Sequence, residues 1–196
     1  KQIWQRGATQ VSEMAGVSAE IRGRLEKRAF ISGLDTALVE ASEDGTVKYL
    51  WRLVDGQTVE SVLIPEENRL TLCMSSQVGC AMACTFCLTG DLGLKRNLTV
   101  AEIASQPLQV QHAIGLDRPI TNLVFMGMGE PLHNIDNLLP ALKICLDENG
   151  LNFSHRRVSV STVGLADKLQ QLAESVPVNL AISLNATTEE QRKRIM

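Results

Sequence analysis

The chain has 196 residues, of which 44% are hydrophobic, and a formal net charge of −3 at pH 7. This composition is typical of a globular chain with one sizeable core, and no apolar run approaches a membrane span. The small negative charge excludes an overall basic surface, so a nucleic acid would have to bind a local basic face. We find no signal-peptide pattern, and the five cysteines therefore indicate a reducing cytoplasm, where clustered cysteines more often bind metals than form disulfides.

The N-terminal third predicts a helix followed by a small antiparallel sheet. Residues 10–30 place apolar side chains on one face, beside basic ones, and favour a helix. Residues 36–64 alternate between apolar and polar side chains and are divided by two Asp-Gly pairs, which are a strong signal for hairpins. We therefore expect an antiparallel meander there. The helix face would carry Ile21, Leu25 and Phe30, and the turns would lie at Asp44-Gly45 and Asp55-Gly56.

From residue 69 onward, segments of strand character alternate with segments of helix character. Four strand-helix units in succession predict a parallel sheet, because a parallel crossover needs a connection about as long as a helix. The helix over 99–115 begins with the capping-box pair Thr99 and Glu102, and Pro107 is expected to kink or interrupt it. The remaining segments are the strands RLTLCM, ITNLVFMG, RRVSVSTV and VPVNLAISL, the helices over 135–148 and LADKLQQLAES, and a last helix with Thr187 and Glu190 in capping-box spacing.

The two ends of the chain indicate an excised piece. The chain begins at Lys1, without an initiator methionine, and stops at Met196 inside a helical pattern that no glycine or proline ends. We therefore expect it to belong to a longer protein.

The stretch CAMACTFC, residues 80–87, places three cysteines in the spacing C-x3-C-x2-C, in the loop after the first parallel strand. Functional residues of such sheets gather at the carboxyl ends of strands. Three thiolates can hold three corners of a cubic 4Fe-4S cluster and leave one iron open for another ligand. A structural zinc site needs four ligands, so Cys73 or another residue would have to be the fourth. The pattern favours the cluster and leaves zinc as the alternative.

The same spacing, with the aromatic Phe86 before the last cysteine, resembles the radical S-adenosylmethionine (SAM) enzymes. The segments TLCMSSQVGCAMACTFC, NLTVAEI, PITNLVFMGMGEPL, RRVSVSTVG and LAISLNA closely resemble the dual-specificity RNA methyltransferases, which methylate C2 of an adenine in 23S rRNA and in some tRNAs. The resemblance spans essentially the whole chain. It implies an α/β fold with three parts: a helical accessory segment at 1–34, a small antiparallel β extension at 35–66, and a partial (βα) radical-SAM barrel at 67–196 with about four of six units.

The resemblance also implies a metal-binding and a catalytic set. Cys80, Cys84 and Cys87 match the ligands of the 4Fe-4S cluster. Glu60 matches a proton acceptor, and Cys73 matches one of the family's two methylation cysteines. Taken alone, Glu60 is an ordinary solvated strand carboxylate, and Cys73 is a small buried hydrophobe.

A third set matches the residues that bind SAM. Gly129 and Glu130, in GMGEP, match the segment at its methionyl end, with Glu130 suited to accept a hydrogen bond from the ammonium group. Without the cysteines, GMGEP has a plainer interpretation as a turn. The further cofactor contacts are Ser161, Ser183, Leu184 and Asn185. Asn185 stands where some relatives are expected to have histidine, and asparagine cannot titrate.

The implied reaction uses two SAM molecules. One methylates a cysteine that lies beyond residue 196 in the family, and the other is cleaved to a radical that activates this methyl group for transfer to the adenine, after which Cys73 resolves the adduct. The implied partners are 23S rRNA, some tRNAs and an external one-electron donor. The chain alone is expected to be inactive. Candidate RNA contacts are Arg22, Arg24, Lys27, Arg28, Lys95, Arg96, Arg156 and Arg157.

Three alternatives stay open on the sequence. One is the antibiotic-resistance relative that methylates C8 of the same adenine. Another is an incomplete fragment that binds a cluster or RNA without catalysis. The last is a zinc-stabilised structural domain.

Overall fold

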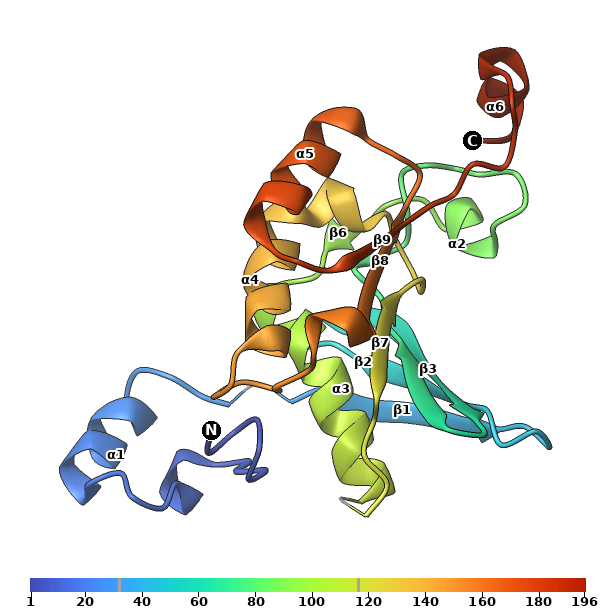
Figure 1. Ribbon diagram of the computed structural model, residues 1–196. Coiled ribbons are helices and arrows are strands. Elements are labelled where there is room, and N and C mark those ends of the chain that lie inside the picture. The colour runs from blue at the N-terminus through green and yellow to red at the C-terminus, as the bar shows by residue number, and fades with distance from the viewer. Residues whose placement is uncertain (32, 116) are drawn as a thin grey trace.

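A seven-stranded sheet organises the chain in the computed structural model, which describes residues 1–31, 33–115 and 117–196. The strand order is β1-β2-β3-β4-β7-β8-β9; the pairs from β1 to β4 are antiparallel and those from β4 to β9 are parallel (Figure 1). The expected meander and the parallel series therefore share one sheet. The strands are β1 (Asp35–Ala41), β2 (Val47–Arg52), β3 (Thr58–Glu66), β4 (Arg69–Cys73), β7 (Asn122–Phe125), β8 (Val158–Thr162) and β9 (Asn179–Ile182).

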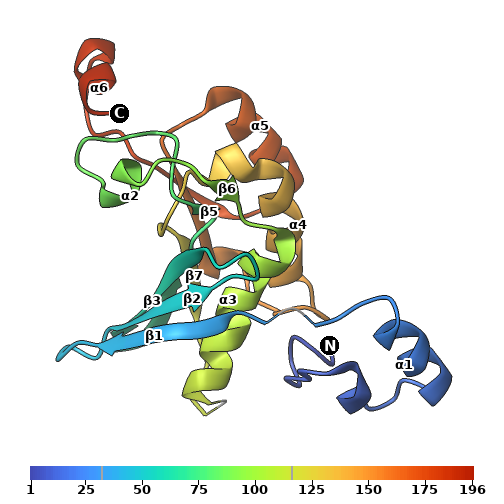
Figure 2. The same ribbon diagram turned by 180° about the vertical axis from the view of Figure 1, so that it is seen from behind.

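Three helices connect the parallel strands and cover one face of that half of the sheet (Figure 2). They are α3 (Val100–Ile114), α4 (Ile135–Leu146) and α5 (Ala166–Ser175). The largest fully buried side chains of the core include Trp51, Leu72 and Phe125 from the sheet and Leu138 from α4. This arrangement confirms the expected α/β fold with strand-helix units in parallel succession.

Local signals fixed the turns and the start of α3 as expected. Asp44 and Asp55 each accept a hydrogen bond from the backbone two residues on, which stabilises the two hairpin turns. The Thr99 hydroxyl accepts from the backbone N–H of Glu102, and the Glu102 carboxylate accepts from that of Thr99. Pro107, however, does not interrupt α3: it is buried inside a continuous helix, so the expectation of a break was wrong.

The N-terminal segment differs from the single helix expected over residues 10–30. It forms a 3-10 turn, η1 (Val11–Glu13), and a separate helix, α1 (Ala19–Glu26). Gly16 has a φ of 79° between them, a left-handed conformation that no helix continues through, and the Ser18 hydroxyl caps α1. The expected apolar face is not packed, because the exposed fractions are 50% for Ile21, 37% for Leu25 and 81% for Phe30.

The remaining elements are short. Strands β5 (Gln77–Val78) and β6 (Arg96–Asn97) pair antiparallel and close the base of the loop that carries the three cysteines. The last helix, α6 (Glu189–Ile195), is capped by Thr188, not by the expected Thr187, since the Thr188 hydroxyl accepts from the backbone N–H of Gln191. The others are α2 (Leu88–Asp91), η2 (Pro131–Asn134) and η3 (His155–Arg157). Within the described ranges, no helix is long and apolar enough to cross a membrane.

Candidate functional site

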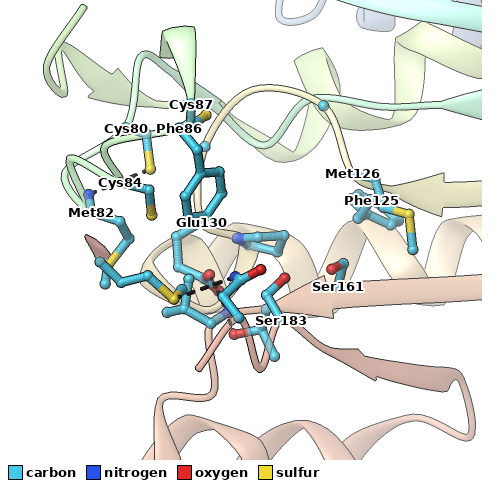
Figure 3. Close-up of a pocket in the computed structure, with 17 residues that line it drawn as sticks. Cys80, Met82, Cys84, Phe86, Cys87, Phe125, Met126, Glu130, Ser161 and Ser183 are labelled. Carbon is cyan, nitrogen blue, oxygen red and sulfur yellow. Dashed lines mark hydrogen bonds between the residues drawn. The ribbon is translucent and has the colours of Figure 1, made fainter. Parts of the chain in front are cut away.

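A cavity of about 320 Å³ lies at the carboxyl ends of β7, β8 and β9, under the cysteine loop (Figure 3). It unites most of the residues expected to bind the cluster and the cofactor. Their sequence positions span more than a hundred residues, and the parallel sheet brings them together because its strands all end at the same edge. The expected residues that line it are Cys80, Cys84, Cys87, Gly129, Glu130, Ser161, Ser183 and Asn185.

The cysteine loop is closed at its base by a tight backbone contact. Gly79 has a φ of 75°, and a Cβ there would lie 1.8 Å from the carbonyl oxygen of Gly93, so only glycine fits. Beyond this contact Cys80 and Cys84 are buried, Cys87 is half-buried, and the sulfur atoms of Cys80 and Cys84 point into the cavity that Glu130 lines (Figure 3).

The electrostatics of the cysteines favour the protonated thiol in the absence of a positive partner. Burial raises the pKa of Cys80 and of Cys84, and the mutual repulsion of the thiolates and the charge of Glu130 raise both pKa values further. A positively charged iron centre removes this penalty, because metal ligands bind as thiolates. The thiols should therefore release protons when they bind metal.

The donor set fits a cluster better than a single zinc ion. Within the described residues, no three His, Cys, Asp or Glu side chains are gathered as the ligands of one metal ion. Cys73, the suggested fourth zinc ligand, does not line the cavity. It is half-buried on β4, where its thiol accepts from the backbone N–H of Met126 and burial raises its pKa. Three thiols around one cavity match the three cysteine ligands of a cubic 4Fe-4S cluster whose fourth iron is open.

Glu130 is the buried acidic group of the site, with an exposed fraction of 3%. Its Oε1 accepts from the backbone N–H of Leu132 at 2.9 Å and from the Thr162 hydroxyl at 2.7 Å, and its Oε2 accepts from the backbone N–H of Val163 at 2.9 Å. A carboxylate has about four acceptor positions, so Oε2 retains one. The residue therefore fixes the cavity wall and can still accept one donor from a bound molecule.

The segment that follows β9 and lines the cavity is hydrogen-bonded to α6. Arg192 donates to the carbonyl oxygens of Ser183, Leu184 and Val163, and so ties the end of β9 to the loop after β8. The backbone N–H of Thr85 donates to the carbonyl of Ile195 at 2.9 Å, which brings α6 to the cysteine loop. Ser183 and Asn185 line the cavity, whereas Leu184 does not, and its side chain is 59% exposed.

Glu60 lies outside this cavity. It lines a neighbouring one of about 690 Å³, between the meander and the cysteine loop, together with Lys95 and Asp91. Its carboxylate is partly exposed and lies 3.6 Å from the ammonium group of Lys48. The structure therefore separates Glu60 and Cys73 from the predicted cofactor residues. Lys95 lines the same cavity, while Arg96 is engaged by Asp55 and Glu102.

Thr162 and Gln77 are site residues that the sequence did not reveal. Both are buried, and both bond Glu130: Thr162 through its hydroxyl and Gln77 through its side-chain oxygen, which accepts from the Glu130 backbone N–H. The strand and loop patterns around them gave no signal, because the bonds join segments far apart in the sequence. Met82, Met126 and Met196 also line the cavity without having been expected there.

The chain is also similar to known proteins over its whole length. The model of the Radical SAM superfamily matches residues 74–196. The dual-specificity RNA methyltransferase RlmN of Geobacter sulfurreducens is 59% identical over the whole chain, and that of Geotalea uraniireducens is 56% identical. The chain spans about half the length of these relatives, 53% and 56%. A crystal structure of a radical SAM methyltransferase from Sphaerobacter thermophilus is 38% identical and superposes with a TM-score of 0.91, covering all of this chain and 58% of that one.

Proposed function

Because the chain belongs to the radical SAM superfamily, we propose that it is the cluster-binding and cofactor-binding part of an RNA methyltransferase that methylates C2 of an adenine in 23S rRNA and in tRNA. Membership implies a 4Fe-4S cluster and SAM as cofactors. The observation that carries the proposal is the convergence of three cysteine thiols and a buried glutamate on one cavity. The RNA activity concerns the whole protein, since the chain spans about half of its curated relatives.

The chain's own residues divide the binding work. Cys80, Cys84 and Cys87 would hold three irons and leave the fourth open to SAM. The free acceptor position on Glu130 Oε2 suits the ammonium group of the methionyl end. Ser161 and Ser183 line the same cavity and offer hydroxyls for its polar atoms.

When bound, the cluster would supply one electron for the reductive cleavage of SAM, and the radical formed would open a route to adenine C2, a carbon that is not a useful nucleophile. For the RNA steps we propose the roles that the resemblance gives to Glu60 as proton acceptor and to Cys73 in resolving the adduct. Cys73 accepts from the backbone of Met126, a cavity-lining residue, and so lies directly behind the cavity wall. Glu60 would act from the neighbouring cavity, where a target base would have to be unstacked to reach it.

The expected partners follow from this activity. We propose 23S rRNA and tRNA as substrates, an external one-electron donor, and a cytoplasmic location. Four basic residues of the segment around α1, of which Arg22 is half-buried and the other three are exposed, offer phosphate contacts, which would make RNA binding weaken steeply with salt. They are Arg22, Arg24, Lys27 and Arg28, and Arg22 also donates to the backbone carbonyl of Ser12.

The first test concerns the site itself. The chain is reconstituted with iron and sulfide without oxygen, reduced, and examined by electron paramagnetic resonance with and without SAM. We expect a reduced 4Fe-4S signal that changes when SAM is added, that is absent in Cys84→Ala and that persists in Cys73→Ser. Stoichiometric zinc without iron, lost equally in both variants, would instead establish the zinc-stabilised domain.

The second test concerns the reaction and uses the protein at its full length. It is incubated with 23S rRNA or tRNA, SAM and a reductant, and the nucleosides are separated and weighed by mass spectrometry. We expect 2-methyladenosine. Formation of 8-methyladenosine would assign the protein to the C8-methylating relatives, and the absence of both with an intact cluster would contradict the methyltransferase proposal.

A further inference from the structure

Gln77, three positions before Cys80, is completely buried and connects the base of the cysteine loop to the loop after β7. Its side-chain oxygen accepts from the backbone N–H of Glu130 at 2.9 Å, and its side-chain nitrogen donates to Asn97 Oδ1 at 2.7 Å. Its backbone N–H donates to the carbonyl of Met128 at 3.2 Å. One residue thus bonds both the loop after β7 and the strand β6 that closes the base of the cysteine loop.

The loop after β7 lies directly on this side chain. Gly129 has a φ of 97°, and a Cβ at this position would lie 2.5 Å from the Cβ of Gln77. A side chain at residue 129 would therefore push the loop away from Gln77 or strain its backbone. The glycine and the glutamine form a matched pair, in which close approach permits the bond to Glu130.

The bonds continue beyond Glu130 to the end of β8. The Glu130 carboxylate accepts from the Thr162 hydroxyl and from the backbone of Val163. Three hydrogen bonds therefore link Asn97, Gln77, Glu130 and Thr162, which lie on β6, on β5, after β7 and on β8; Glu130 takes part through its backbone N–H toward Gln77 and through its carboxylate toward Thr162. A carboxamide suits the central position because it accepts on one atom and donates on the other.

We propose that Gln77 is a positioning residue that sets the place of Glu130, and thereby of bound SAM, relative to the three cysteines. This rests on the proposed function for the identity of the bound molecule. The physical basis is that groups supporting a binding residue fix its orientation, and a small displacement weakens the bonds that it makes. Gln77 itself is not among the residues that line the cavity, so it would act through Glu130.

The experiment compares Gln77→Met, which keeps the length of the side chain and removes both hydrogen bonds, with Gln170→Met on the exposed side of α5. Amide hydrogen exchange is measured first on the chain without cluster. We expect the Glu130 amide to exchange at least about fivefold faster in Gln77→Met, with the amides of β8 unchanged, because the variant removes the buried hydrogen bond that this amide makes. Unchanged exchange at Glu130 would overturn the proposal.

The second readout is the spectroscopy of the reconstituted protein. Gln77→Met should keep its iron content and its reduced signal without SAM, bind SAM about tenfold more weakly, and show a different spectrum at saturating SAM. Gln170→Met should match the wild type in all three. Wild-type affinity and an identical SAM-bound spectrum in Gln77→Met would refute a positioning role. A wild-type chain that holds no cluster would contradict the proposed function, while the exchange result would still decide whether Gln77 fixes Glu130.

A milder variant covers the case in which Gln77→Met fails to fold. Asn97 is exposed and accepts a hydrogen bond from the Gln77 side-chain nitrogen. Asn97→Ala therefore leaves the bond between Gln77 and Glu130 in place but removes the bond that holds the other end of the Gln77 carboxamide. We expect about threefold faster exchange at Glu130 and a smaller loss of SAM affinity in the same direction. No change in either quantity would show that the series of bonds does not transmit position.

Discussion

Glu130 accepts three hydrogen bonds from the protein itself, so it should stabilise the fold as well as bind a cofactor. In Glu130→Gln an NH2 group replaces one of the two carboxylate oxygens. Both oxygens accept from backbone N–H groups, so the new NH2 group would point at a donor with which it cannot form a hydrogen bond. We expect the free energy of unfolding to fall by about 1–3 kcal/mol, and SAM to bind more weakly as well. Urea denaturation of the chain without cluster measures the first effect separately from the second.

The matched control is Glu174→Gln on α5. Glu174 is exposed and accepts a single bond from Gln170, which an amide oxygen can also accept, so its stability should change by less than about 0.5 kcal/mol. Equal stabilities for the two variants would mean that Glu130 contributes to binding alone.

At the scale of elements, two glycines in different settings should respond oppositely to the same change. Gly129→Ala introduces a Cβ against Gln77 at a φ of 97°, so we expect a loss of about 2–4 kcal/mol in unfolding free energy. Gly23→Ala lies inside α1 with open space around it, where alanine is the better helix former and should be neutral or stabilise α1 by up to about 1 kcal/mol. Urea midpoints and helix content by circular dichroism compare them. Similar losses in both variants would contradict the packing argument.

The start of α3 also carries a pH-dependent contribution. Burial alone would raise the pKa of Glu102, but the Arg96 guanidinium and the capping bonds from Thr99 outweigh it and hold the pKa below its usual range. Arg96 also pairs with Asp55 in the second hairpin, so the ion pairs join the meander to the base of the cysteine loop. A lowered carboxyl pKa means that the stabilisation is complete above the unfolded pKa and disappears as the pH falls through the folded pKa.

We therefore expect Glu102→Gln to lose about 1–3 kcal/mol of unfolding free energy at pH 7, and the difference from wild type to shrink as the pH falls below about 4. Urea denaturation at pH 7, 5 and 3.5 gives the comparison. A difference that stays constant over this range would show that the effect is steric and not electrostatic.

At the scale of the whole molecule, the sequence predicted what local chemistry decides. The Asp-Gly turns and the Thr99 capping box depend on neighbours in sequence, and they form as expected. The single helix predicted over 10–30 does not form because Gly16 adopts a left-handed conformation, and the apolar side chains of Ile21 and Leu25 on α1 remain 50% and 37% exposed.

The residues of the site likewise divide into those that the sequence predicted and those that only the fold brings together. The convergence of the cysteines with Glu130 follows from parallel strands ending at one edge, which the strand-helix alternation already predicted. The supporting bonds of Gln77 and Thr162 were invisible, since each joins segments more than thirty residues apart. The separation of Glu60 from the cavity depends on the path of the cysteine loop, which no periodicity describes.

The sheet ends in two very different edges, and this predicts how the isolated chain behaves at high concentration. Among the residues that the structure describes, β9 pairs with β8 alone; it has no charged residue and leaves Leu180 and Ile182 47% and 46% exposed. β1, at the other edge, also exposes apolar side chains but carries Asp35 and Glu40. Unpaired apolar edges associate, and charged side chains on an edge oppose this.

We therefore expect the chain to self-associate through β9. Leu180→Lys should weaken that association by at least about tenfold, because a lysine on an edge strand blocks pairing with another strand. The control Val39→Lys places the same charge on β1 at a residue of similar exposure, 48%, and should leave association nearly unchanged. Sedimentation velocity over a concentration series measures both, with circular dichroism confirming the fold. If Val39→Lys is the variant that weakens self-association, the chain associates through β1, and the absence of charge on β9 does not determine which edge pairs.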